Sequence, residues 1–232
     1  MTVGDLIVAA LERQGVAAAF GVVSIHNMPI LDAIHRRGRI RFVPARGEAG
    51  AASMADACAR VSGGLGVVVT STGTAAGNAT GGLVEALTAG TPLLHLTGQI
   101  DSPYLDRNLG FLHEAPDQLG MLRAVSKAAF RIGRPHEAPA VMAQAIRAAL
   151  TAPAGPVSVE IPIDVQQAEA PAEAGEPAER IAVQGSPPSI ELLAERLLAA
   201  KRPLLWLGGG ARHAGDAVRR LVDLGFGALT TV

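Results

Sequence analysis

Three short segments of the sequence are almost continuously apolar and are bounded by glycine or proline. They are GVVVTS at residues 66–71, PLLHLT at 92–97 and PVSVEIP at 156–162. A strand that is apolar on both of its faces is typical of a parallel sheet covered by helices on both sides. The sequence therefore predicts an α/β fold, a doubly wound and mostly parallel sheet with helices on both faces.

Helical and strand-like segments alternate around these three runs. Helices are expected at residues 2–14, 28–37, 48–63, 74–87 and 136–150, further strands at 17–22, 39–43 and 128–132, and an irregular stretch at 98–116. In such folds, ligands bind at the carboxyl ends of the strands. Glu48, the pair Thr72 and Gly73, and Gln99 all follow predicted strands, so we expect them to converge at that edge of the sheet.

Composition argues against a nucleic-acid-binding, membrane or secreted protein. The net charge is −1, which gives no electrostatic basis for binding nucleic acid or an anionic membrane. The single cysteine, Cys58, excludes an intrachain disulfide and fits a reducing compartment. The amino-terminal residues lack the basic leader of a signal peptide, and no apolar run approaches the ~20 residues that span a bilayer. We therefore expect a cytoplasmic protein.

The character of the sequence changes after Val165. Residues 166–188 are rich in Pro, Ala and Glu without apolar periodicity, which predicts an extended linker. Residues 189–232 then give a helix, a strand ending in glycines, a second helix and a second strand, the first β-α-β of a second Rossmann-like domain. So small a sheet does not stand alone. We expect one complete domain at 1–165, a linker, and an incomplete domain at 189–232.

Glu48 is the most informative charged residue. It begins a helix rich in Ala and Gly, directly after a predicted strand. A carboxylate at this place can simply complement the helix dipole, which contributes about 0.3–1 kcal/mol. Alternatively, it can hydrogen-bond a ligand in a pocket whose floor is made of small side chains. The residues alone leave both readings open.

Five motifs in order match one family. The segments are RFVPARGEAGAASMADACARVSG, STGTAAGNATGGLVEAL, PLLHLTGQ, the pair Ser126 and Lys127, and GPVSVEIPIDVQQ. Together they resemble the pyrimidine-binding domain of thiamine-diphosphate enzymes of the acetolactate synthase type. The following residues, including RPLLWLGGG, resemble the entry to that family's middle domain. The resemblance covers essentially the whole chain.

The resemblance implies a role for each matched residue. Glu48 would bond N1′ of the cofactor's aminopyrimidine and favour the tautomer whose N4′ removes the C2 proton, in a 2-oxo acid decarboxylase or carboligase. Lys127 becomes a candidate on the substrate side. The other residues implied to bind the cofactor are Val22, Val23, Ser24, Thr72, Gly73, Asn78 and Gln99. Asn78 could alternatively cap its own helix.

Several positions depart from the family's motifs. Val23 and Ser24 stand where the family often has Pro-Gly. His113 replaces a glutamine of the active site, and it becomes a candidate catalytic residue because histidine transfers protons near neutral pH. The competing interpretation of His113 is a histidine on a surface loop. Gly47 replaces a histidine before the glutamate.

The family holds the cofactor's diphosphate and Mg²⁺ in a carboxyl-terminal domain whose Gly-Asp-Gly…Asn motif does not occur here. The resemblance therefore implies half of a thiamine diphosphate site, no metal ligand in this chain, and the need for a diphosphate-binding domain. It also implies a homodimer or tetramer formed through the pyrimidine-binding domain. FAD or another nucleotide could bind the glycines at 208–210, which alternatively only permit a tight turn.

Two other functions remain open at this stage. One is a small subunit of a two-chain thiamine-diphosphate decarboxylase. The other is a non-catalytic nucleotide-binding or interaction module of similar fold, because fold alone does not settle function.

Overall fold

The structure is a computed structural model that describes residues 1–171 and 186–230. The chain divides into two compact units, residues 1–181 and 182–232, and each is described by itself. Most of the predicted linker, residues 172–185, lies outside the described residues, as do residues 231–232.

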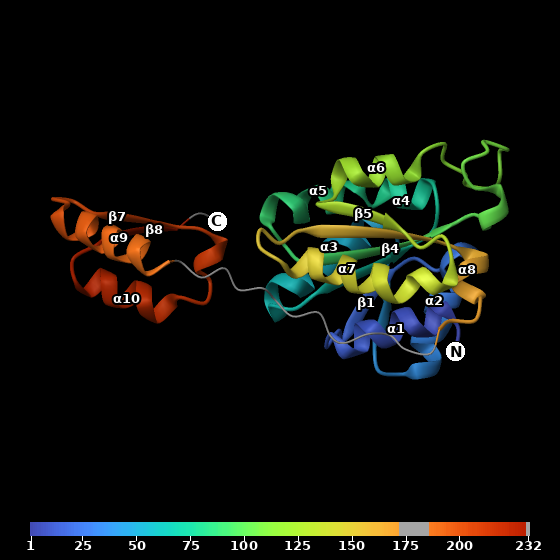
Figure 1. Ribbon diagram of the computed structural model, residues 1–232, viewed down its shortest axis with the longest axis horizontal. Coiled ribbons are helices and arrows are strands. Elements are labelled where there is room, and N and C mark those ends of the chain that lie inside the picture. The colour runs from blue at the N-terminus through green and yellow to red at the C-terminus, as the bar shows by residue number, and fades with distance from the viewer. Residues whose placement is uncertain (172–185, 231–232) are drawn as a thin grey trace. The chain divides into compact units, whose positions relative to one another are not determined.

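The first unit is built on a six-stranded sheet in which every pair of neighbouring strands is parallel (Figure 1). The strand order is β2-β1-β3-β4-β6-β5. The strands are β1 (Ala18–Gly21), β2 (Arg41–Pro44), β3 (Gly66–Thr70), β4 (Leu93–Gln99), β5 (Ala128–Arg131) and β6 (Pro156–Pro162). This confirms the predicted doubly wound α/β fold.

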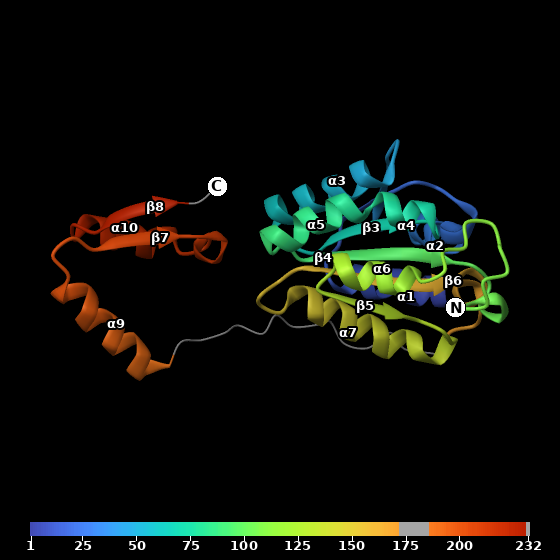
Figure 2. The same cartoon turned by 90° about the horizontal axis from the view of Figure 1, so that it is seen from above.

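Helices cover both faces of the sheet (Figure 2). One face packs on α1 (Val3–Arg13), α2 (Met28–Arg37) and α7 (Ala138–Leu150), and the other on α3 (Glu48–Ser62), α4 (Thr74–Asn78), α5 (Thr80–Ala89) and α6 (Gln118–Val125). Val67 and Val69 of β3 join the first core and Val68 joins the second. The alternation explains why the strand is apolar throughout.

Some helices differ from the sequence prediction. The helix predicted over residues 74–87 is interrupted, and Thr80 donates its hydroxyl to the carbonyl of Gly77 (2.7 Å) where α4 gives way to α5. A hydroxyl that bonds a carbonyl of the preceding turn competes with the helix ladder. Helix α6 was not predicted. Gln166 and Gln167, placed in the linker by the sequence analysis, belong to the short helix α8 (Ile163–Gln167), and Gln166 is fully buried.

The second unit has α9 (Pro187–Ala199), β7 (Leu204–Leu207), α10 (Gly215–Asp223) and β8 (Gly227–Thr230), with β7 and β8 paired in parallel. Among its described residues, only Phe226 is buried, and Trp206 of β7 is 75% exposed. Leu205, Leu207, Val218 and Leu221 are half-buried, so the described part of this unit has only a small apolar core.

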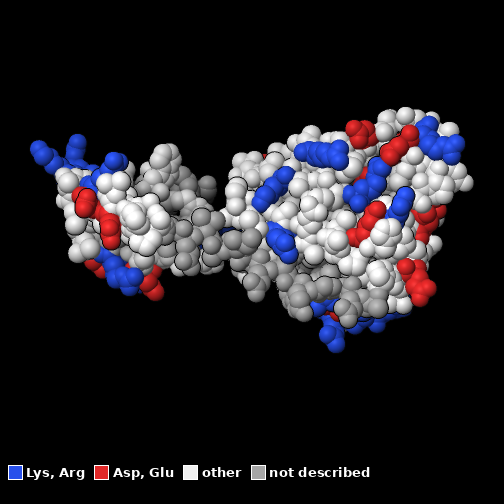
Figure 3. All heavy atoms as spheres, in the orientation of Figure 1, with Lys and Arg blue, Asp and Glu red and all other residues white. Residues whose placement is uncertain are grey.

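Charged side chains of both signs are distributed over the face of the first unit drawn in Figure 3, as the near-neutral net charge suggests. Among the described residues, no helix combines the length and apolarity needed to cross a membrane. The cytoplasmic location stays a prediction.

A chain of buried polar side chains runs across the centre of the sheet. The ring of His95 lies 2.8 Å from Thr70 Oγ1 through Nε2 and 3.0 Å from Ser158 Oγ through Nδ1, and Ser158 lies 2.8 Å from Ser126 Oγ. Complete burial lowers the pKa of His95 to about 3. The folded protein therefore holds this imidazole neutral.

Acid should destabilise the first unit through His95. Between pH 6.5 and about 3 the unfolded chain binds a proton that the folded one does not, so stability falls as pH falls. One unit of pH is worth at most about 1.4 kcal/mol, so we expect a loss of about 2 kcal/mol between pH 7 and 5. Urea unfolding at both pH values measures it. His95→Gln should weaken the dependence of stability on pH, whereas the same change at exposed His136 should leave it as in the wild type. An equal dependence in the wild type and both variants would contradict the role given to His95.

Candidate functional site

The turn after β1 is fixed by its own side chains. Ser24 N donates to Asn27 Oδ1 (3.0 Å), and Asn27 Nδ2 donates to the carbonyl of Val22 (2.9 Å). Ser24 Oγ donates to Ser71 Oγ at the end of β3 (2.7 Å). Val23 stays 57% exposed, so this turn presents an apolar side chain outward at the carboxyl edge of the sheet.

Glu48 is the first residue of α3, and its chain neighbours are small. Asn78, the last residue of α4, donates Nδ2 to Glu48 Oε2 (3.1 Å). A methyl group added at Gly47 or at Gly50 would meet no atom within 4 Å. Glu48 is therefore half-exposed at a helix amino terminus, and an amide holds one of its carboxylate oxygens. The amide contact gives Asn78 a partner that neither sequence reading of this residue had named.

Thr72 and Gly73 form a buried turn after β3. Gly73 adopts φ +57° and ψ −107°, and a Cβ at this position would lie 1.8 Å from the carbonyl oxygen of His113. Only glycine fits here, because the backbone is in the left-handed half of φ and another backbone passes directly over it. Thr72 Oγ1 lies 2.7 Å from Gln99 Oε1, so these two predicted site residues meet in the interior.

His113 lies in the loop after β4, over the Gly73 turn. Its ring stands edge-on to that of His26, with centroids 6.4 Å apart and planes at 76°. His26 is buried, and burial is the main cause that lowers its pKa. The charge of His113 lowers this pKa further, whereas the charge of Asp101 raises it. His26 also lies near Ser71 Oγ (3.4 Å through Nδ1). Sequence reasoning missed His26, although its place two residues after the Val23–Ser24 turn was a usable signal.

Comparison with known proteins shows the family. The family model described as "Thiamine pyrophosphate enzyme, N-terminal TPP binding domain" matches residues 1–121. This chain belongs to the thiamine pyrophosphate enzyme family. The model's extent takes in all the site residues described above, from the turn after β1 to the loop that carries His113.

Individual relatives of this family member align along almost its whole length. A probable 2-ketoarginine decarboxylase of Pseudomonas aeruginosa is 34% identical over 225 residues, 96% of this chain and 40% of the relative. The large subunits of acetolactate synthase isozymes 2 and 1 of Escherichia coli are each 33% identical, over 90% and 96% of this chain and 37% and 39% of their own length. The chain thus spans about 40% of the length of these relatives.

The structure brings some predicted site residues of this family member together. Glu48 and Asn78 form one contact pair, and Ser24, Gly73 and His113 cluster around the ends of β1, β3 and β4. Whether each residue touches the cofactor stays a prediction. In the described part of the chain, no group of three or more His, Cys, Asp or Glu residues is placed to hold a metal ion.

Lys127 lies elsewhere. It precedes β5, at the amino edge of the sheet, and its Nζ donates to the carbonyls of Ala148 and Thr151, 2.7 Å each, at the end of α7. Burial lowers the pKa of this amine. The geometry makes Lys127 a cap for the carboxyl end of α7. Its placement lends no support to the predicted role on the substrate side, because it faces away from the carboxyl ends of the strands.

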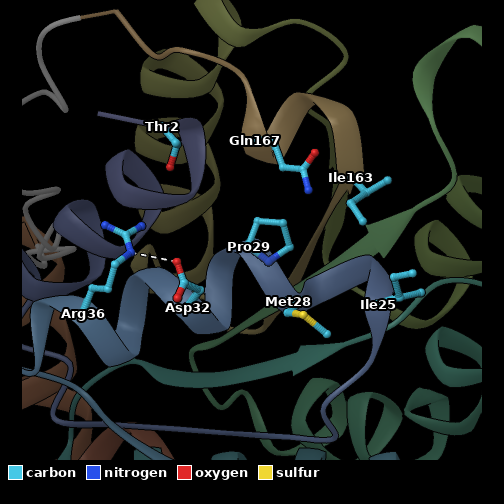
Figure 4. A pocket seen from close by; sticks show the side chains of 8 residues that line it. All are labelled: Thr2, Ile25, Met28, Pro29, Asp32, Arg36, Ile163 and Gln167. Atoms are coloured by element: carbon cyan, nitrogen blue, oxygen red, sulfur yellow. Dashed lines mark hydrogen bonds and ion pairs between the residues drawn. The ribbon is translucent and has the colours of Figure 1, made fainter.

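Two further features involve residues that were not predicted to bind the cofactor's pyrimidine. A pocket of about 430 Å³ is lined by α2, α8 and their surroundings (Figure 4); its lining residues are Thr2, Ile25, Met28, Pro29, Asp32, Arg36, Ile163 and Gln167. None of these was predicted as a site residue. In the second unit, Gly209–Ala211 form a 3-10 turn after β7, and the nucleotide or FAD site considered at Gly208–Gly210 stays a prediction.

Proposed function

We propose that this chain supplies the pyrimidine-binding half of a thiamine diphosphate site in an acetolactate-synthase-like decarboxylase or carboligase that acts on 2-oxo acids. The observation that carries the proposal is the placement of Glu48, a half-exposed carboxylate at the start of α3 that Asn78 contacts through one of its oxygens. The family match and the relatives' names support the same reading.

The chain's own residues would act on the pyrimidine as follows. Glu48 would hold a proton at the ring nitrogen N1′, since a carboxylate stabilises a neighbouring cation. Asn78 would fix the orientation of Glu48, and the exposed side chain of Val23 would give the ring an apolar surface. When bound, thiamine diphosphate supplies the nucleophilic carbon and the electron sink for decarboxylation. Mg²⁺ and the diphosphate would be held by a separate diphosphate-binding domain.

Carbon dioxide release tests this function. We expect no release from 2-oxo acids by this chain alone, and release by the chain joined to or mixed with a diphosphate-binding domain, in a manner that requires thiamine diphosphate and Mg²⁺. Pyruvate and 2-ketoarginine are suitable first substrates, because they represent small and long cationic 2-oxo acids. Carbon dioxide release by the chain alone, or without thiamine diphosphate, would refute the proposal that this chain holds only half of the cofactor site.

The half-site also predicts weak binding of the cofactor. The isolated chain contacts only the pyrimidine side, so the charged diphosphate gains neither Mg²⁺ nor donors. We expect titration calorimetry to find a dissociation constant for thiamine diphosphate well above the micromolar range. A micromolar constant that is unchanged by Mg²⁺ would show a complete site and contradict the proposal.

Pairing between copies of this domain belongs to the same proposal. The exposed face of α3 and α5 carries Val61 (91% exposed), Val84 (43%) and Leu87 (38%) among small residues, which suits close helix packing. We propose that this face takes part in a homodimer or tetramer. Sedimentation at tens of micromolar should find the dimer, and a monomer at all concentrations would count against it.

A further inference from the structure

The buried side-chain amide of Gln118, the first residue of α6, joins several strand ends at the site. Gln118 is 1% exposed. Its Oε1 accepts a hydrogen bond from Gly73 N (2.6 Å) and lies 3.0 Å from Thr72 Oγ1, whose one proton is shared with Gln99 Oε1 (2.7 Å). Its Nε2 donates to the carbonyl of Gly98 (3.2 Å) and to Glu160 Oε2 (3.0 Å). A carboxamide offers two acceptor and two donor positions; here both donors and one acceptor have their own partners, and the second acceptor shares the proton of Thr72.

The orientation of the amide is fixed by a buried charge. Glu160 on β6 is fully buried, and its Oε1 lies 2.5 Å from Arg131 Nε. Arg131 in turn pairs with Asp106 in the loop that carries His113 (2.6 Å). The NH₂ end of Gln118 must face the carboxylate of Glu160, which turns its oxygen toward the backbone N–H of Gly73. The amide therefore cannot flip without losing bonds at both ends.

The turn that Gln118 contacts has an unfavourable backbone conformation at Gly73. Gly73 has a positive φ and lies directly under the carbonyl of His113. A backbone in such a conformation persists only when its surroundings determine it. The bond from Gly73 N to Gln118 is the contact that ties the turn to α6, and the bond to Gly98 ties it to the end of β4.

We propose that Gln118 is a positioning residue for the cofactor-binding turn Thr72–Gly73 and for His113 above it. The proposal rests on the proposed function, because it assumes that this turn borders the pyrimidine. Gln118 touches neither the cofactor nor the reacting atoms. It sets the distance between the ends of β3 and β4, and hence the shape of the wall on which the pyrimidine would lie.

Hydrogen exchange of the Gly73 amide in this chain tests the inference. In Gln118→Met, which keeps the length of the side chain but offers no hydrogen bond, we expect Gly73 to exchange about tenfold faster in NMR spectra. Gln144→Met on the exposed face of α7 is the matched control and should change nothing at Gly73. Equal exchange at Gly73 in the two variants would overturn the inference.

A second variant covers the case in which Gln118→Met fails to fold. Gln118→Glu keeps an oxygen for Gly73 N but loses the N–H donors to Gly98 and Glu160. One proton shared with Glu160 would relieve the repulsion of the two carboxylates. We expect the Gly73 amide to stay protected in it; loss of that protection in the folded variant would overturn the inference.

The Michaelis constant for thiamine diphosphate, measured with a diphosphate-binding domain present, separates this inference from the proposed function. We expect Gln118→Met to raise it about tenfold with a smaller change in kcat. Faster hydrogen exchange at the Gly73 amide, with the Michaelis constant and kcat both unchanged, would show that Gln118 holds the turn. It would also show that the turn does not border the cofactor. That outcome would contradict the proposed function and not the positioning role.

Discussion

Glu48→Gln is expected to slow exchange of the C2 hydrogen of bound thiamine diphosphate by ~10²–10⁴-fold, the range that general acid–base catalysis commonly supplies. Glutamine keeps the size of the side chain and an oxygen for Asn78 Nδ2, but it carries no charge to stabilise a proton at N1′. The melting temperature should hardly change, because a carboxylate at a helix amino terminus is worth only about 0.3–1 kcal/mol. Deuterium exchange of the cofactor, with a diphosphate-binding domain present, measures the effect.

Glu85→Gln is the matched control for this prediction. Glu85 is exposed on α5, so the same chemical change there should leave the exchange rate at the wild-type value. The structural reading of Glu48 predicts the reverse pattern for Glu48→Gln, a lower melting temperature with exchange at the wild-type rate. That result would show that Glu48 only complements the dipole of α3.

Arg131→Met is expected to destabilise the first unit by about 3–5 kcal/mol, because it leaves the fully buried carboxylate of Glu160 without its cation. Urea unfolding at neutral pH measures the loss. Circular dichroism is the better probe, since the single tryptophan, Trp206, lies in the second unit.

Two further proteins complete the Arg131 experiment. Arg123→Met on the exposed side of α6 should change stability by no more than about 0.5 kcal/mol, as surface substitutions usually do. The double variant Arg131→Met with Glu160→Gln should regain part of the loss, because it removes the buried charge as well. A loss below about 1 kcal/mol in Arg131→Met would mean that water or other donors already satisfy Glu160.

Several structural elements were predictable from local sequence. The continuous apolar runs predicted β3, β4 and β6, since a strand buried on both faces tolerates few polar side chains. The helices predicted to end at residues 37 and 63 end at glycines, and Gly38 and Gly63 take positive φ at the ends of α2 and α3. These signals act within a few residues of the chain, so they can be read without the tertiary structure.

The interruption between α4 and α5 was not predictable in the same way. The segment from Thr74 to Ala89 has no clear apolar periodicity, because its residues are mostly Ala, Gly and Thr. Small residues are compatible with one helix or with two. The hydroxyl of Thr80 on the carbonyl of Gly77 and the packing of Gly82 against Ala52 of α3 accompany the observed arrangement.

The sequence by itself determined the parallel sheet, the strand ends at which the candidate site lies, and Glu48 as the residue most worth testing. Only the tertiary structure decided which polar side chains meet. Asn78 reaches Glu48 across 30 residues of sequence and Gln118 reaches Glu160 across 42. Lys127, which the motif grouped with the site, caps a helix at the opposite edge of the sheet. The physical reason is that apolar burial is set by local pattern, whereas a polar side chain's role depends on distant partners.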